Sequence, residues 1–179
     1  MDEFYTRRLF FRRFKISDLM DFYQYAKHPK VGPAAGWAPH KSIEESKRTL
    51  LHFCLNKEIW AIVWRDTGKM IGTIGLHRKT DAQGQGFFEL GYALAYAYWG
   101  KGIMTEAVTK VLEVAFTVMH LKELYVSHFP DNDRSRHIIE KCGFHYVETV
   151  SDSCCMYDGS LKDRIVYRMK RESYLQHLE

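Results

Sequence analysis

Apolar residues recur along the chain with two different spacings, and these spacings predict helices and strands in alternation. Over residues 17–26 and 102–119, apolar side chains return every three or four positions, as on one face of an amphipathic helix. Residues 59–64 form an unbroken run rich in β-branched and aromatic side chains, which is typical of a buried strand. Turn residues at 66–69 separate this run from a second strand over 70–76, so a hairpin is expected here.

Capping residues indicate two further helices. Ser42, with Glu45 three positions later, forms a capping-box pattern that predicts a helix to about residue 55. Gly143 has the character of a C-cap and predicts that a short helix over 132–142 ends there. The remaining apolar runs predict strands over residues 9–14, 87–94, 123–129, 144–150 and 164–169. This order is a mixed α/β arrangement, and its lack of regular βαβ alternation disfavours a doubly wound sheet.

Length, charge and composition exclude several classes of protein. A chain of 179 residues fits one domain, which we expect to cover residues 1–179. The net charge of +4 is spread along the chain, so no direct contact with nucleic acid is expected. No apolar run approaches the roughly 18 residues that span a bilayer, and the first residues are charged. We therefore expect a cytoplasmic protein without a membrane partner, and without a metal site, because the cysteines and histidines lack ligand spacing.

A glycine-containing segment over residues 98–105 lies between a predicted strand and a predicted long helix. Gly100 and Gly102 allow the backbone to turn tightly and to bring successive N–H groups close to a ligand. The first N–H groups of the helix lack internal acceptors and carry the positive end of its dipole. The segment therefore suits an anion, most naturally a pyrophosphate. The alternative is a turn that uses glycine for sharpness alone.

About thirty residues later come Asn132-Asp133-Arg134-Ser135 and then Glu140-Lys141-Cys142-Gly143-Phe144. Together with the glycine segment, in this order, these motifs resemble the GNAT acetyltransferase superfamily. Glu89-Leu90-Gly91-Tyr92, followed by residues 98–107, resembles its RimJ/RimL group of ribosomal-protein N-terminal acetyltransferases. The resemblance covers residues 9–169 and implies an α/β GNAT-like fold. That fold has a central, mostly antiparallel mixed sheet of about six or seven strands, with the family's fourth and fifth strands splayed apart, and about four flanking helices.

The resemblance also implies acetyl-CoA as co-substrate and assigns residues to it. The diphosphate of coenzyme A would be held by the backbone amides of one continuous segment: Trp99, Gly100, Lys101, Gly102, Ile103, Met104 and Thr105. The pantetheine arm would pair with the backbone of three strand residues: Tyr92, Ala93 and Leu94. Trp99 and Met104, the first and last positions of the family's diphosphate motif, differ from its usual residues.

Two helix residues complete the family's pattern. Asn132 matches the asparagine that hydrogen-bonds the pantetheine arm, and Ser135 matches the serine near the thiol sulfur. The tyrosine that many members use as general acid would fall at Ile139, so that role is vacant and Ser135 is our substitute. Both residues are also ordinary types for the first turn of a helix, where they would serve only to cap it.

Glu89 is the candidate catalytic base. On a strand over 87–94, positions 89, 91 and 93 share one face, and aromatic neighbours predict a semi-apolar cleft around the carboxylate. Burial there would raise its affinity for a proton. Glu89 also matches the glutamate of the RimJ/RimL strand. The alternative is an edge-strand glutamate that faces water or pairs with a lysine.

The resulting functional hypothesis is an N-acetyltransferase, monomeric or homodimeric, whose acceptor is a protein N-terminal α-amine of the ribosomal-protein type. Two other hypotheses are kept: a small-amine acetyltransferase acting on a polyamine, amino acid or aminoglycoside, and a non-catalytic acyl-CoA sensor. The loops over 27–42 and 79–86 would select the acceptor, and Trp37 is expected at the acceptor-binding mouth.

Overall fold

The computed structural model describes residues 3–176, which divide into two compact units. The first unit contains the chain up to residue 75 together with 92–107, and the second contains 76–91 and the chain from 108 onward. The domain boundaries expected from the sequence, 1 and 179, lie outside the described residues at both ends.

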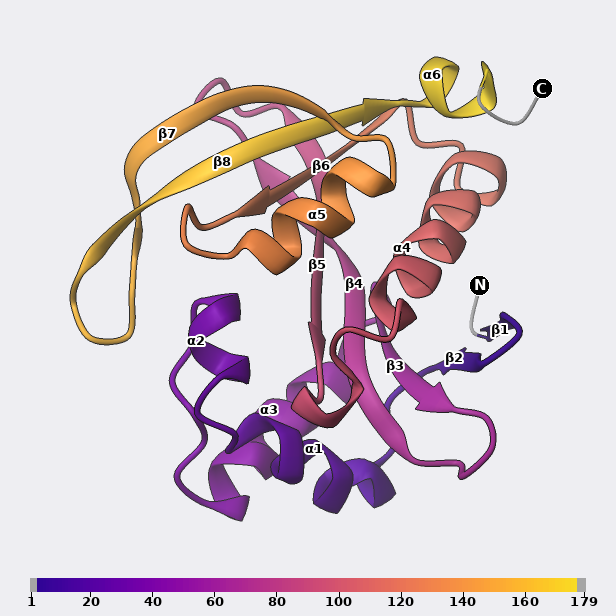
Figure 1. Ribbon diagram of the computed structural model, residues 1–179, viewed down its shortest axis with the longest axis vertical. Helices are drawn as coiled ribbons and strands as arrows, with labels where there is room; N and C mark the ends of the chain where they lie inside the picture. Colours follow the sequence, from indigo (N-terminus) through magenta and orange to yellow (C-terminus); the bar gives the residue numbers. More distant parts are fainter. Residues whose placement is uncertain (1–2, 177–179) are drawn as a thin grey trace. The chain divides into compact units, whose positions relative to one another are not determined.

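Eight strands form one open mixed sheet (Figure 1). They are β1 (Phe4–Tyr5), β2 (Leu9–Arg12), β3 (Ile59–Trp64), β4 (Met70–Thr80), β5 (Gly86–Leu94), β6 (Glu123–His128), β7 (His145–Cys155) and β8 (Leu161–Lys170). Their order in the sheet is β1-β2-β3-β4-β5-β6-β8-β7. The pair β5–β6 is parallel, while β1–β2, β2–β3, β3–β4, β6–β8 and β7–β8 are antiparallel. The expected mixed, mostly antiparallel sheet is confirmed, with eight strands instead of six or seven.

Six α-helices accompany the sheet within the described part of the chain. They are α1 (Leu19–Ala26), α2 (Val31–Ala35), α3 (Ile43–Leu55), α4 (Ile103–Glu113), α5 (Asp133–Lys141) and α6 (Arg171–Gln176). Short 3₁₀ turns precede α1 (η1, Ile16–Asp18) and α4 (η2, Tyr96–Tyr98), and a π-helical segment, η3 (Val114–Val118), extends α4. The prediction of about four helices was too low, because α2 and α6 were not foreseen. None of the helices described is both long and apolar enough to cross a membrane.

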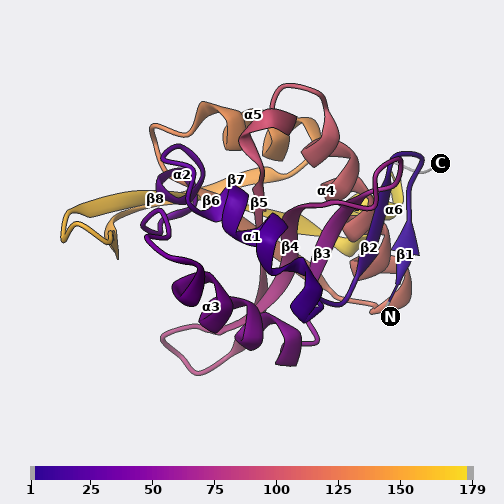
Figure 2. The same ribbon diagram turned by 90° about the horizontal axis from the view of Figure 1, so that it is seen from below.

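The first unit is built on an antiparallel meander of β1, β2, β3 and the start of β4, which lie side by side in Figure 2. All of β3 except Trp64 is buried, as its unbroken apolar sequence predicts. Aromatic side chains of α1 and the β2–α1 connection, among them Phe14 and Phe22, pack with Leu50 of α3 against β3. Helix α3 begins where predicted: the Ser42 hydroxyl accepts from the Glu45 amide, while the Glu45 carboxylate accepts from the amide of Lys41.

A buried ion pair joins β2 to the start of α1. Two nitrogens of the Arg12 guanidinium donate to the two carboxylate oxygens of Asp18 at 2.7 and 2.8 Å, and both side chains are buried. The Asp18 carboxylate also accepts from the Lys15 amide at 2.8 Å. No side-chain cap of α1 is made, and the Asp18 carboxylate instead closes the preceding turn. The hydrogen bond and charge of Asp18 raise the pKa of Arg12 against the effect of burial.

The second unit contains the long β7–β8 hairpin (orange and yellow in Figure 1), β6 and helix α5. Most of β7 is exposed, and its register to β8 shifts twice, between Tyr146 and Glu148 and between Val150 and Cys154. The sequence predicted only residues 144–150 and 164–169 as strands, so the hairpin is longer than expected. Helix α5 ends at the predicted glycine: Gly143 has φ +86°, and the Phe144 amide donates to the Ile139 carbonyl in a Schellman-type closure.

Candidate active site

The glycine segment at the start of α4, in the first unit, has the backbone conformation that its sequence predicts. Gly100 and Gly102 have φ values of +72° and +68°, in the left-handed region that side chains other than glycine rarely adopt. The turn η2 leads into it, and α4 begins directly after it at Ile103. The two glycines therefore set the direction in which the chain enters the helix.

Several amides of this segment lack a protein acceptor. In the described part of the chain, the N–H groups of Gly100, Lys101 and Gly102 donate to no backbone or side-chain oxygen. The next amides, from Ile103 to Thr105, belong to the first turn of α4, where an intrahelical acceptor does not exist. An anion placed here would meet several N–H donors and the positive end of the helix dipole.

Trp99 and the side chain of Lys101 have partners within the protein. The amide of Trp99 donates to the Tyr96 carbonyl at 3.1 Å as part of η2, and its indole donates to the Leu94 carbonyl at 2.8 Å. Lys101 directs its ammonium to the Ala97 carbonyl at 2.8 Å. Amides without a protein acceptor therefore begin at Gly100, one residue after the start of the predicted diphosphate segment, and the contribution of the Trp99 amide stays a prediction.

The C-terminal part of β5, residues Tyr92 to Leu94, lies against β4 within the first unit. A Cβ atom added to Gly72 would come within 2.5 Å of the Ala93 carbonyl oxygen, so the two backbones approach as closely as glycine permits. The register of β5 with β6 joins Glu89 to Tyr125 and Leu90 to Val126, and among the described residues it goes no further.

Asn132 and Ser135 lie together at the start of α5, in the second unit. The Asn132 side-chain oxygen accepts from the Ser135 amide at 3.1 Å, so Asn132 is the N-cap of this helix. The Ser135 side chain is buried. Asn132 therefore caps α5, as one of the two interpretations predicted. The ligand role that the resemblance implies for it stays a prediction. Ile139, on the same helix, is only 1% exposed, so the position that corresponds to the family's tyrosine is a core position.

Glu89 lies on β5 in the second unit with two polar partners. Its carboxylate accepts from the Ser127 hydroxyl at 2.7 Å and lies 3.6 Å from the Arg164 guanidinium, with 17% of its side chain exposed. We expected semi-apolar surroundings for this carboxylate, but its two neighbours named here are polar. The alternative of a solvent-facing glutamate is not observed either. Glu89 is an oriented carboxylate with a hydroxyl donor and a cation beside it.

The sequence did not reveal Ser127 and Arg164 as partners of Glu89. Ser127 lies two positions after Tyr125, which pairs with Glu89, so both face the same side of the sheet. Val166 pairs with Ser127, and Arg164 lies two positions before it on β8. Only the strand order and register bring Ser127 and Arg164 to Glu89, and no local sequence pattern contains that information. Gly91, next on the face of Glu89, has no room for a side chain, because an added Cβ would lie 2.8 Å from His77.

Trp37 is a half-buried residue of the first unit. It packs against the apolar cluster of that unit, and an added Cβ at Gly32 would come within 2.6 Å of its ring. His40 lies beside it, with Nδ1 2.7 Å from the hydroxyl of the buried Ser46, and burial lowers the His40 pKa despite the nearby charge of Glu45. These contacts give Trp37 a packing role, and its expected place at the acceptor-binding mouth stays a prediction.

Comparison with known proteins identifies the class of enzyme. Residues 8–145 match the family model described as "Acetyltransferase (GNAT) domain", a stretch that includes residues of both units. The chain is therefore an N-acetyltransferase, of a family that uses acetyl-CoA and acts on amines. It belongs to the GNAT acetyltransferase family.

Three known proteins illustrate the similarity. The uncharacterized N-acetyltransferase YoaA of Bacillus subtilis is 30% identical over 167 residues, which cover 90% of this chain and 93% of YoaA. The ribosomal protein uS5-alanine N-acetyltransferase of Escherichia coli is 27% identical over 77 residues, 43% of this chain and 39% of that enzyme. The structure of spermidine N-acetyltransferase from Vibrio cholerae, in complex with CoA and spermine, superposes with a TM-score of 0.77 and 17% identity, over 95% of this chain and 99% of that one.

Proposed function

We propose that this enzyme transfers the acetyl group of acetyl-CoA to a protein N-terminal α-amine, as in the ribosomal-protein group. The observation that carries the proposal is the run of unengaged amides from Gly100 to Thr105, beside two glycines of positive φ. These N–H groups would hold the diphosphate of coenzyme A, and residues 1–179 would work as one acetyltransferase domain. The match of the family model to residues of both units supports that domain assignment.

The reaction needs three groups besides the diphosphate site: a base for the amine, a donor for the oxyanion and a proton donor for the leaving sulfur. The amine attacks the thioester carbon, the tetrahedral oxyanion then collapses to an amide, and coenzyme A leaves as the thiol. A backbone N–H of Ala93 or Leu94 would stabilise the oxyanion, and Tyr92 to Leu94 would pair with the pantetheine arm. Asn132 would hydrogen-bond the same arm, and the Ser135 hydroxyl would supply a proton to the leaving sulfur.

Glu89 would remove the proton from the amine. A protein α-amine has a pKa of about 8, whereas a lysine amine has one of about 10.4, and this gap corresponds to about 3 kcal/mol less work at neutral pH. An oriented carboxylate, held by Ser127 and Arg164, is therefore a sufficient base for an α-amine. The lower pKa of the α-amine supports an N-terminal α-amine over a lysine side chain as acceptor.

The relatives support the acceptor class without fixing it. The sequence similarity to a ribosomal-protein alanine N-acetyltransferase favours a protein N-terminus, while a spermidine N-acetyltransferase has the same fold. A small amine is therefore the second candidate.

A thiol-release assay tests the proposal. Acetyl-CoA would be incubated with N-terminal peptides of ribosomal proteins, the same peptides with blocked α-amines, polyamines, amino acids and aminoglycosides, and free thiol measured. Thiol release with unblocked peptides alone supports the proposal. Release with a small amine alone establishes the second candidate, and coenzyme A binding without release on any acceptor points to an acyl-CoA sensor.

Replacing Glu89 with glutamine is expected to lower turnover by at least about tenfold at pH 6.5–7, because a positioned general base contributes substantially to rate. The defect should shrink toward pH 9–10, where the α-amine is already free of its proton. The measurement is the pH–rate profile with the best acceptor. An unaltered profile would show that Glu89 has only a structural role.

Glu123→Gln is the matched control for this variant. Glu123, on β6, also lies beside an arginine, with its carboxylate 3.5 Å from Arg168, and it accepts from the Tyr125 hydroxyl. The substitution removes the same charge from the same sheet, away from the proposed base. Its turnover should stay within about twofold of the native enzyme, since exposed ion pairs contribute little.

A further inference from the structure

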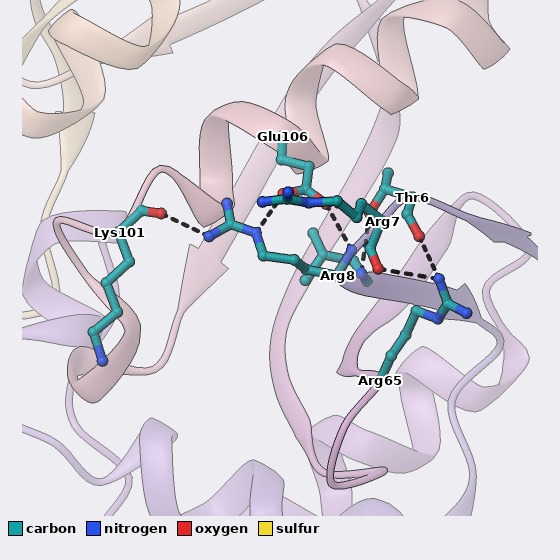
Figure 3. Close-up of polar contacts among 7 residues, drawn as sticks. Thr6, Arg7, Arg8, Arg65, Lys101 and Glu106 are labelled. Carbon is teal, nitrogen blue, oxygen red and sulfur yellow. Dashed lines mark hydrogen bonds and ion pairs between the residues drawn. The ribbon is translucent and has the colours of Figure 1, made fainter.

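An arginine outside the glycine segment is bonded to it. Arg8, just before β2, donates from Nη1 to the Lys101 carbonyl at 3.0 Å (Figure 3). Its Nε donates to the Glu106 carboxylate at 2.6 Å, and its backbone amide donates to the other oxygen of that carboxylate at 3.0 Å. One residue thus contacts the glycine segment and the first turn of α4 together, and all these groups belong to the first unit.

Two further groups form hydrogen bonds next to Arg8. Arg65 donates from Nη1 to the carbonyls of Thr6 and Arg7 at 2.9 and 3.0 Å, as Figure 3 shows. The Thr6 hydroxyl donates to the Glu106 carboxylate. Burial raises the pKa of Glu106, but the hydrogen bonds from Thr6 and Arg8 outweigh it, so the net pKa is lowered and the group is a carboxylate. The guanidinium therefore has an ionised partner that holds it toward the segment.

The bond to Lys101 determines where the next amide points. In a trans peptide, the C=O and the following N–H point in opposite directions. Because the Lys101 carbonyl points to Arg8, the Gly102 N–H points away from it. A flipped peptide would present a carbonyl oxygen, in place of this N–H, to any anion bound there.

Charge gives Arg8 a second effect. A carboxylate in the first turn of α4 would repel a diphosphate bound to the same helix terminus. The ion pair with Arg8 offsets that charge, and a guanidinium nitrogen lies 3.9 Å from the position of a Cβ on Gly102. Removal of Arg8 alone therefore leaves an unpaired carboxylate close to the segment.

We propose that Arg8 is a positioning residue for the diphosphate of acetyl-CoA, acting through the Lys101 carbonyl, with Glu106 as its anchor. This inference rests on the proposed function, since it concerns the same diphosphate site. Arg8 acts by orienting the Gly102 N–H and by neutralising Glu106.

Calorimetric titration of the full chain with coenzyme A tests the inference without knowledge of the acceptor. Arg8→Gln should raise the dissociation constant about tenfold. The Arg8→Gln/Glu106→Gln double variant should recover part of that loss without recovering folding stability, because it removes the unpaired carboxylate but no structural bond is restored. Arg65→Gln is the matched control: it removes two hydrogen bonds to the carbonyls of Thr6 and Arg7 but touches neither Lys101 nor Glu106. Its coenzyme A affinity should stay within about twofold of native.

An unchanged affinity of Arg8→Gln, or an equal loss in Arg65→Gln, would overturn the inference. If Arg8→Gln does not fold, Arg8→Lys serves in its place, since an ammonium cannot reach both Glu106 and the Lys101 carbonyl as the planar fork does. Gly102→Val, titrated in parallel, separates the two levels of proposal. If Gly102→Val weakens binding and the Arg8 variants do not, only the role of Arg8 fails; if Gly102→Val binds normally, the diphosphate site itself is wrong.

Discussion

Valine in place of Gly102 is expected to weaken coenzyme A binding by about 100-fold. Apart from its chain neighbours, no heavy atom lies closer than 3.9 Å to a Cβ added at Gly102, so a branched side chain would occupy the proposed position of the diphosphate. Loss of one or two charge-assisted hydrogen bonds, each about 1.5–3 kcal/mol, corresponds to this change in affinity. Calorimetric titration with coenzyme A measures it.

Gly68→Val supplies a matched control in the same unit. Gly68 has φ +69°, almost the value at Gly102, and no atom lies within 4 Å of an added Cβ. Both variants should therefore lose a similar stability, about 1–2 kcal/mol for a side chain in the left-handed region. Only Gly102→Val should lose affinity; equal affinities in the two variants would mean that the bend binds no phosphate.

Alanine in place of Asp18 is expected to reduce the free energy of unfolding by about 3–5 kcal/mol, because it leaves the Arg12 guanidinium buried without its counter-charge. Urea denaturation measures the change. The double variant Arg12→Met/Asp18→Leu should lose less than the single one, since no unpaired charge remains.

The exposed pair of Lys110 and Glu113, three residues apart on α4, provides the comparison. Glu113→Ala should change the free energy of unfolding by less than about 0.5 kcal/mol, as is usual for surface pairs. A comparable small change in Asp18→Ala would show that the Arg12–Asp18 pair does not hold β2 to the α1 junction.

Elements with strong local signals were predictable from the sequence. The β3–β4 hairpin, the start of α3 at Ser42 and the end of α5 at Gly143 depend on apolar runs, turn residues and caps within a few positions. Helix α2 was missed because Gly32 and Pro33 read as a loop, although proline is tolerated in the first turn of a helix. The long β7–β8 hairpin was missed because polar, exposed strands have no apolar alternation, and their pairing depends on each other.

The residues of the candidate site likewise fall into two groups, those recognisable from the local sequence and those brought together only by the fold. The glycine segment and its helix were recognisable because all their determinants are adjacent in sequence. Ser127 and Arg164 reach Glu89 only through strand order, and Arg8 reaches Lys101 across 93 residues of chain. Residues that position a reacting group in this way cannot be identified until the topology is known. Trp37 packs against the apolar cluster of the first unit, and its expected place at the acceptor-binding mouth stays a prediction.

Strand β7 is the last in the sheet order, so its outer edge presents backbone donors and acceptors to a neighbouring molecule. Its two register shifts, the second of which contains Asp152 at φ +48°, interrupt the straight row of groups that another strand would need for pairing. The hairpin can therefore remain long and solvent-facing while it resists edge-to-edge aggregation.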